Sequence, residues 1–257
     1  MNRVFLALVL LLIAFGAAAQ TTNGLSKAEI EGRQLVQEIL EQAPTTNFTQ
    51  TGTLTIRPAK GMTTNVPVVF DTSLETGYWE VIYTVNTNSS EISLMIIRRD
   101  GLPNQYSLSK GDNISSGGVE KLTPLHLTPA NKLNEAQIMA PFAGSDFWIA
   151  DLGLEFFHWP GQKILKHEDR RTRACAVLES TNPNPAPGAY SRVVTWIDNE
   201  SLAIVWAEAY DANSKLLKEF DPKKVKKING RWELESMEIR NVQTKSRTSI
   251  KFDLNSK

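Results

Sequence analysis

The feature that most restricts the fold is a succession of short segments in which apolar and polar residues alternate. The first four such segments, rich in β-branched and aromatic residues, lie at 52–57, 66–70, 78–85 and 91–99. A period of two residues is typical of strands that bury one face. The connections between these segments are short, and a parallel pair would need a crossover of a dozen or more residues. The pattern therefore predicts an antiparallel meander.

The second half of the chain continues in the same style. A proline-rich stretch at 182–188 interrupts it, and strand patterns stand on both sides, which favours a loop over a domain linker. Residues 105–128 have low hydrophobic density and are interpreted as a surface excursion with at most one strand, and 129–139 as a short helix. Further strands are expected at 154–159, 163–167, 173–180, 191–197, 202–210, 218–228, 232–241 and 247–254. Residues 20–257 are predicted to form one mainly β domain.

One helix is predicted near the N-terminus. Ser26 and Glu29 have the spacing of a capping box. Pro44 is expected to end the helix. Between these signals, apolar residues recur at three- and four-residue spacing, as on one face of a helix: Ile30, Leu35, Val36, Ile39 and Leu40.

Residues 1–19 have the composition of a cleavable export signal. Arg3 supplies a positive start, an apolar run follows from 4 to 15, and small alanines end it at 17–19. A membrane anchor is the alternative, but a membrane span needs about 20 apolar residues. We expect cleavage after Ala19 and an exported, periplasmic mature protein with no integral membrane segment.

Charge and cysteine content exclude some classes of protein. The chain has 28 basic and 28 acidic side chains, which argues against a nucleic-acid-binding surface. Its single cysteine, Cys175, cannot form an intramolecular disulfide. Cys175 lies in an apolar strand-like run, so a buried, unreactive thiol is expected.

The alternation also predicts which residues share a dry face. Trp79, Val81 and Tyr83 lie opposite Glu80 in their segment, and apolar side chains share parity in two other segments. Such a face has two interpretations: an ordinary filled core, or the lining of a lipid cavity, for which aromatic residues offer large rigid surfaces. The shared-parity residues of the other segments are Ile92, Leu94 and Ile96, and Leu202, Ile204 and Trp206.

A series of motifs in the second half resembles the outer-membrane lipoprotein-sorting family. The series begins with Gly144-Ser145-Asp146-Phe147 and Asp151-Leu152, where Ile149-Ala150 departs from the family's Tyr-Glu. Each motif alone is weak, but their order and spacing from about residue 140 to 254 are more specific. The later motifs are the segments 175–179, 192–198, 210–220, 228–232 and 248–250.

The resemblance implies an incomplete β-barrel. It would be a strongly bent antiparallel sheet of about 10–11 strands, with helices covering the open side and an interior that receives lipoprotein acyl chains or another lipid. Such a carrier is a monomer without cofactor or metal, and exchanges cargo with membrane-associated donor and acceptor proteins. The expected cavity residues are Trp79, Val81, Leu94, Ile96, Trp196, Ile204, Trp206 and Trp232, and the family-motif residues are Ser145, Asp146, Phe147, Asp151 and Leu152.

Two other classes of function stay open. An exported hydrolase would need a nucleophile or metal site. No Gly-x-Ser-x-Gly elbow is present, and His126, His158 and His167 lack the spacing of a zinc motif. A non-catalytic envelope interaction module with the same fold and a filled core cannot be separated from a carrier by sequence.

Two basic runs have alternative interpretations as well. Residues 223–227 could dock on anionic lipid headgroups or be a solvated edge strand guarded by lysines. Residues 169–173 could face an acidic partner or form a charged turn.

Overall fold

Twelve strands form a single antiparallel sheet in the computed structural model, which describes residues 24–87, 90–112, 132–228 and 231–254. The strand order is β5-β4-β3-β2-β1-β12-β11-β10-β9-β8-β7-β6. The strands are β1 Phe48–Arg57, β2 Thr64–Glu75, β3 Tyr78–Asn86, β4 Ser90–Arg98, β5 Gln105–Asp112, β6 Gly161–Arg170, β7 Arg173–Thr181, β8 Arg192–Asp198, β9 Ile204–Tyr210, β10 Leu216–Ile228, β11 Arg231–Asn241 and β12 Ser246–Phe252.

The chain starts in the middle of this sheet and runs outward twice. From β1 it meanders to the edge strand β5, crosses to the opposite edge β6, and meanders back until β12 pairs with β1. The predicted meander is confirmed, and its one long connection is the crossover between β5 and β6. The two edges do not pair with each other, so the sheet is an incomplete barrel, as predicted, with twelve strands instead of 10–11.

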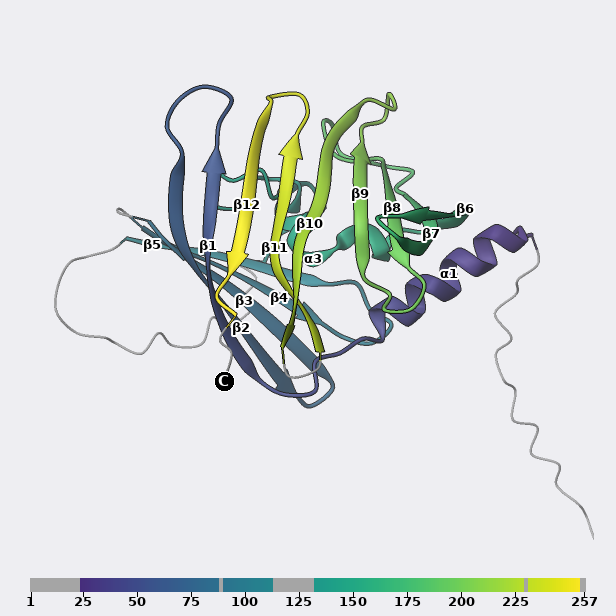
Figure 1. Ribbon diagram of the computed structural model, residues 1–257, viewed down its shortest axis with the longest axis horizontal. Coiled ribbons are helices and arrows are strands. Elements are labelled where there is room, and N and C mark those ends of the chain that lie inside the picture. The colour runs from purple at the N-terminus through teal and green to yellow at the C-terminus, as the bar shows by residue number, and fades with distance from the viewer. Residues whose placement is uncertain (1–23, 88–89, 113–131, 229–230, 255–257) are drawn as a thin grey trace, which may run out of the picture.

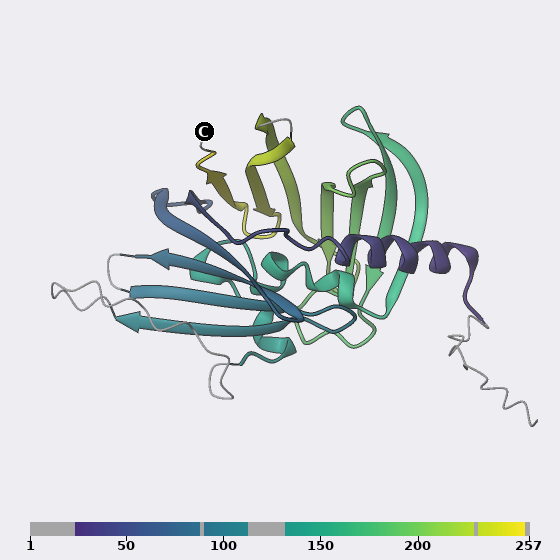
Figure 2. The same cartoon turned by 90° about the horizontal axis from the view of Figure 1, so that it is seen from below.

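Short helices from the crossover lie inside the bend of the sheet (Figures 1 and 2). They are α2 Glu135–Ile138, η1 Phe142–Gly144, α3 Ile149–Gly153 and η2 Glu155–His158. We call the sheet face that packs against them the inner face, the opposite one the outer face, and the helices with their connections (residues 135–158) the plug. The expectation of helices covering the open side is confirmed.

Two of the three buried apolar clusters of the described residues lie on the inner face. One combines β1–β5, β11 and β12 with α2, η1 and α3, and the other combines β6–β9 with η2 and the N-terminal helix. Met139 and Phe220 pack against both clusters. The apolar interior is therefore continuous from one arm of the sheet to the other.

The predicted N-terminal helix is α1, Lys27–Leu40. Ser26 and Glu29 form the expected capping box, and the helix ends at Leu40 with Glu41 as its C-cap, before Pro44. Val36 is buried, and the apolar face of α1 packs over β6. Gly32 lies so close to this strand that a Cβ atom there would be 2.7 Å from the backbone nitrogen of Lys163. A side-chain-free position thus permits the contact between helix and strand.

Several local expectations are corrected or limited. The strand expected at 154–159 is the 3-10 helix η2, which follows Leu154 in the left-handed conformation (φ 53°). Within the described part of the range 129–139, where a helix was expected, the helix is α2. Residues 182–188 do form a loop between β7 and β8 of one sheet. The expected export signal lies outside the described residues, and none of the helices that are described is long and apolar enough to cross a membrane.

Candidate functional site

Four of the expected cavity residues lie on the inner face of β3 and β4. In the antiparallel register Trp79 lies opposite Arg98, and Val81 opposite Ile96. Leu94 lies opposite Tyr83 in the same register. Residues that are directly paired in an antiparallel sheet share a face. Leu94 and Ile96 are 0% and 1% exposed because the plug covers them. They therefore lie in a filled core.

Trp196 and Trp206 are a correction, because they lie on the outer face. A bulge between Trp196 and Ile197 pairs Ile197 with Ile204 and Trp196 with Trp206, which breaks the simple alternation along β9. Ile204 therefore packs with the inner cluster, while both tryptophans join a separate outer cluster with Cys175.

The guanidinium group of Arg170 lies over the rings of both outer tryptophans. The guanidinium carbon of Arg170 is 4.3 Å from the Trp196 ring centroid and 4.7 Å from that of Trp206. The Trp196 indole also donates to Glu168 at 2.5 Å. Trp232 lies in β11 opposite Lys227, but its side chain is outside the described part of the structure.

The plug fills the middle of the inner face and leaves a less buried margin. Phe142, Phe147 and Ile149 are 2–3% exposed and pack on the sheet. Around them, four half-buried apolar side chains, which we call the apolar margin, belong to the same cluster: Ile92, Leu108, Met237 and Phe252. They are four of the ten partly buried apolar residues that pack on this cluster, and they lie on β4, β5, β11 and β12.

The family-motif residue Asp146 ties the plug to the C-terminal strand. Its carboxylate accepts hydrogen bonds from the hydroxyls of Ser246 and Thr248, and its backbone N–H donates to the Thr248 hydroxyl at 2.9 Å. Ser145 bonds the backbone of Phe147, which turns the chain so that the Phe147 ring enters the core. Asp146 and Thr248 are 102 residues apart, a pairing that the sequence did not indicate.

Lys218 is the buried charge of this region, at 2% exposure. Its ammonium group donates to the backbone oxygen of Asp146 at 2.7 Å and to the Asp151 carboxylate at 3.3 Å. It also lies 3.8 Å from the centroid of the Trp148 ring. Burial lowers the pKa of Lys218 to about 8, although the carboxylate of Asp151 acts in the opposite direction.

Asp151 completes this arrangement from the start of α3. The same carboxylate oxygen accepts from the Trp148 backbone N–H at 2.7 Å and from the Tyr190 hydroxyl at 3.2 Å. Burial raises the pKa of Tyr190 well above its usual value. We call Asp146, Asp151, Tyr190, Lys218 and Thr248 the anchor cluster. Because the polar groups described here bond one another, the cluster fixes α3 and the loop before it to β10, β12 and the segment before β8, and it does not expose a reactive group.

Comparisons with known proteins agree with this fold. A protein-family model described as "uncharacterized protein" matches residues 127–255, half of the chain. The chain belongs to that family. The matched region contains the plug, the anchor cluster and the strands from β6 onward. No curated protein matches the chain significantly.

Solved structures extend the likeness to almost the whole chain. A DUF1329 family protein from Desulfovibrio piger has a TM-score of 0.65 at 15% identity, covering 89% of this chain and 92% of its own. A domain assigned to outer membrane lipoprotein sorting, from Vibrio parahaemolyticus, has a TM-score of 0.67 at 16% identity, covering 88% and 92%. A LolA superfamily protein from Nitrosomonas europaea has a TM-score of 0.56 at 14% identity, covering 89% and 93%. The family member described here therefore has a LolA-like fold.

This LolA-like chain does not gather a metal site within its described residues. His158 lies in η2, where Nε2 is buried without a hydrogen-bond partner and burial lowers its pKa to about 4. His167 and Glu168 lie on β6, and His126 is outside the described residues. Cys175 is buried, and its pKa is raised chiefly by burial, as expected of an unreactive thiol.

Proposed function

We propose that this protein is an exported carrier that holds the acyl chains of a lipid or lipoprotein against the inner face of its bent sheet. The observation that carries the proposal is the apolar margin around the plug, Ile92, Leu108, Met237 and Phe252, continuous with the buried inner-face core. Each methylene transferred from water to such a surface contributes about 0.8 kcal/mol. Two acyl chains could thus be held without a covalent link.

The anchor cluster restricts how the acyl chain enters. Lys218 and Thr248 hold the loop and helix around Asp146 and Asp151, so displacement of α3 would expose a buried charge. The acyl chain instead enters beside α3, along β4, β5, β11 and β12, where the margin residues lie. Gly52 faces this region from β1, and the rings of Phe70 and Phe252 approach to 5.1 Å across it.

The cellular role belongs to the same proposal. The likeness to a domain assigned to outer membrane lipoprotein sorting supports a role in that process, and the sequence of residues 1–19 supports export to the periplasm. The carrier would act as a monomer without cofactor, receiving cargo from one membrane-associated protein and releasing it to another that binds it more tightly.

A non-catalytic interaction module is the second candidate. It is favoured by the filled centre of the inner face, where Leu94 and Ile96 are fully buried under the plug. In this case the fold would present its surfaces to partner proteins and bind no acyl chain.

A fluorescent fatty-acyl probe separates the two candidates. We expect the wild-type protein to bind the probe and its tryptophan emission to shift. Polar substitution of two margin residues, Ile92→Asn with Phe252→Asn, should weaken binding at least tenfold, because water then competes for the margin. An arginine at Leu94 is not a suitable test, since that residue is fully buried and the change would unfold the protein.

The matched control is Thr53→Asn with Glu91→Asn, on the outer face of β1 and β4. This variant should bind the probe as the wild type does. A wild-type protein that is folded by circular dichroism but binds no acyl probe would refute the carrier proposal and favour the interaction module.

A further inference from the structure

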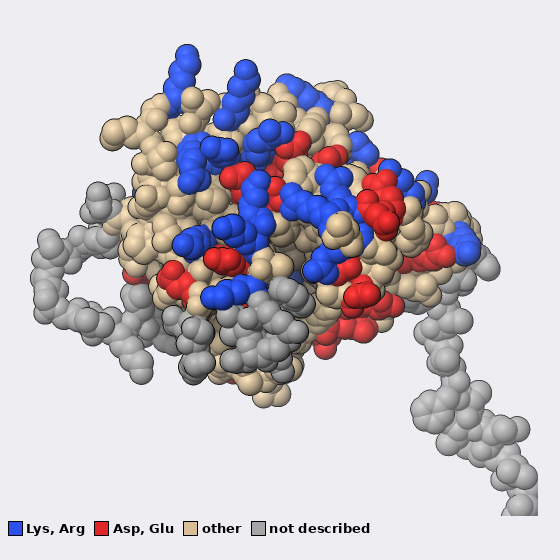
Figure 3. Space-filling view, in the orientation of Figure 1, with Lys and Arg blue, Asp and Glu red and all other residues tan. Residues whose placement is uncertain are grey.

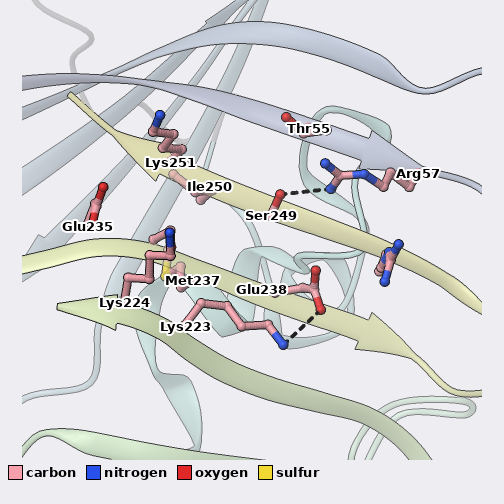
Figure 4. A pocket seen from close by; sticks show the side chains of 12 residues that line it. Thr55, Arg57, Lys223, Lys224, Glu235, Met237, Glu238, Ser249, Ile250 and Lys251 are labelled. Carbon is pink, nitrogen blue, oxygen red and sulfur yellow. Dashed lines mark hydrogen bonds and ion pairs between the residues drawn. The ribbon is translucent and has the colours of Figure 1, made fainter.

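The outer face of the sheet carries an open hollow that acyl binding does not use. It has a volume of about 540 Å³ and is formed by β1, β12, β11 and β10 (Figure 4). A second hollow of about 320 Å³ shares Lys223, Glu238 and Arg247 with it and extends to Trp206 on β9. The lining side chains include Arg57, Lys223, Lys224, Glu238, Arg247 and Lys251.

Basic side chains predominate in this hollow. Arg57, Lys223, Lys224, Arg247 and Lys251 line it, against the carboxylates of Glu235 and Glu238. Lys223 is paired with Asp221 and Glu238. Among the residues that the structure describes, the other four basic side chains form no ion pair; Arg57 donates to the Ser249 hydroxyl. Figure 3 shows Lys and Arg side chains gathered over this face.

Three arginines also stand in a row across neighbouring strands. Arg57 pairs directly with Arg247, and Arg247 with Arg240 on the next strand. Only Arg240 has a carboxylate partner, Glu219. Like charges directly opposite each other destabilise a sheet, so a bound anion would relieve this repulsion. The row spans two inter-strand spacings, roughly 10 Å, which is more than one small anion bridges.

An exposed apolar side chain lies within the basic run of β10. Val225 on β10 is 48% exposed and lies opposite Leu234 on β11. The register shifts between Lys224 and Val225, where β11 has Glu235 as an extra residue. This half of β10 pairs only with β11, because β9 ends its pairing at Phe220. Its basic run is thus a locally free edge within an otherwise interior strand.

We propose that the outer face of β1, β12, β11 and β10 docks the protein on an anionic phospholipid bilayer. Phosphate groups of neighbouring headgroups would lie between Arg57, Arg247 and Lys251. Several headgroups at once can neutralise a basic row of this width, which favours a membrane surface over a single soluble phosphate. Met237 borders the hollow as well as the apolar margin, but Ile92, Leu108 and Phe252 do not line the hollow, so a docked protein could still hold a lipid on its inner face.

Vesicle cosedimentation tests the docking. The full mature chain should bind vesicles containing phosphatidylglycerol at low ionic strength, release them as salt is raised, and ignore vesicles of phosphatidylcholine alone. Arg57→Gln with Arg247→Gln and Lys251→Gln should weaken binding about 100-fold. A matched triple variant on the edges of the sheet, Lys110→Gln with Lys132→Gln and Lys163→Gln, removes three exposed charges elsewhere and should bind normally.

Three results would overturn the docking proposal. One is no binding of the wild type to anionic vesicles at low salt, and another is equal weakening in both triple variants. The third is tight binding of soluble glycerol phosphate without vesicle binding, which would identify a small-anion site. Vesicle docking by a protein that binds no acyl probe would refute the carrier function and leave the docking proposal standing.

Discussion

At the scale of single residues, Lys218 is the most informative position. A lysine that is 2% exposed is retained in the core, bonded to Asp146 and Asp151 of the plug. An apolar residue would cost less to bury. Lys218 therefore contributes specificity, because its ammonium group can donate to both Asp146 and Asp151 in only one position of the loop before α3.

The titration of Lys218 predicts a pH dependence of stability. Its pKa is about 8 in the folded protein and 10.5 for an ordinary lysine. Between these values the unfolded chain binds a proton that the folded protein does not, so the free energy of unfolding rises with pH, by up to about 1.4 kcal/mol per pH unit. Urea unfolding at pH 7.5 and 9.5 should show this gain in the wild type and not in Lys218→Met. Equal gains in both proteins would contradict the assignment.

His158 predicts a slope of the same sign at acidic pH, where the free energy of unfolding again rises with pH. Its pKa is about 4 when folded and 6.5 ordinarily, because burial disfavours the charged imidazole. As pH falls through 6.5 the unfolded chain takes up the proton first, and stability decreases. Since the side chain is partly exposed, we expect a loss of about 1 kcal/mol between pH 7 and pH 5. His158→Phe should reduce this loss in denaturant titrations, and an unchanged loss would exclude His158 as its source.

At the scale of elements, α1 and β6 show how a local signal and a tertiary contact combine. The capping box and apolar face of α1 are readable from the sequence. The close approach of the α1 backbone to Gln162 and Lys163 cannot be read from the sequence. A glycine is required at position 32 only because the helix packs directly on β6.

Gly32→Ala should therefore destabilise the protein in spite of the better helix propensity of alanine. The added methyl would meet the β6 backbone at 2.7–2.8 Å, and backbone cannot rotate away. Overpacking of this kind costs about 1–3 kcal/mol, against a propensity gain of about 1 kcal/mol. Thermal unfolding should show a lower Tm for Gly32→Ala, while the exposed control Gln34→Ala should equal or exceed the wild type. A higher Tm for Gly32→Ala would disprove the close contact.

At the scale of the whole molecule, the sheet order joins distant parts of the chain. Because β1 pairs with β12, neither arm of the sheet is complete without the other end of the sequence. The two inner clusters also meet at Met139 and Phe220. A boundary between independent halves would have to cut both the sheet and the core.

Residues 20–257 should accordingly unfold as one unit. We expect far-ultraviolet circular dichroism and tryptophan fluorescence to report a single, coincident transition in urea. Cleavage in the proline-rich loop at 182–188 should not release two stably folded fragments. Recovery of such fragments after limited proteolysis would show that the chain has two domains.

The sequence by itself determined the class of fold, the antiparallel meander, α1 and the order of motifs that resemble lipoprotein-sorting proteins. These depend on local periodicity, capping and short turns, which act between residues close in the chain. It also placed Trp79, Val81, Leu94 and Ile96 on a common face, since alternation is unbroken along β3 and β4.

Only the tertiary structure decided the rest. The register shift that leaves Val205 as an extra residue on β9 put Trp206 on the outer face while Ile204 faces inward, because one extra residue reverses the alternation beyond it. The bonds from Lys218 and Thr248 to the plug, and the arginine row of Arg57, Arg247 and Arg240, join residues far apart in sequence. Their meeting depends on strand register and on the path of the crossover, which no local pattern encodes.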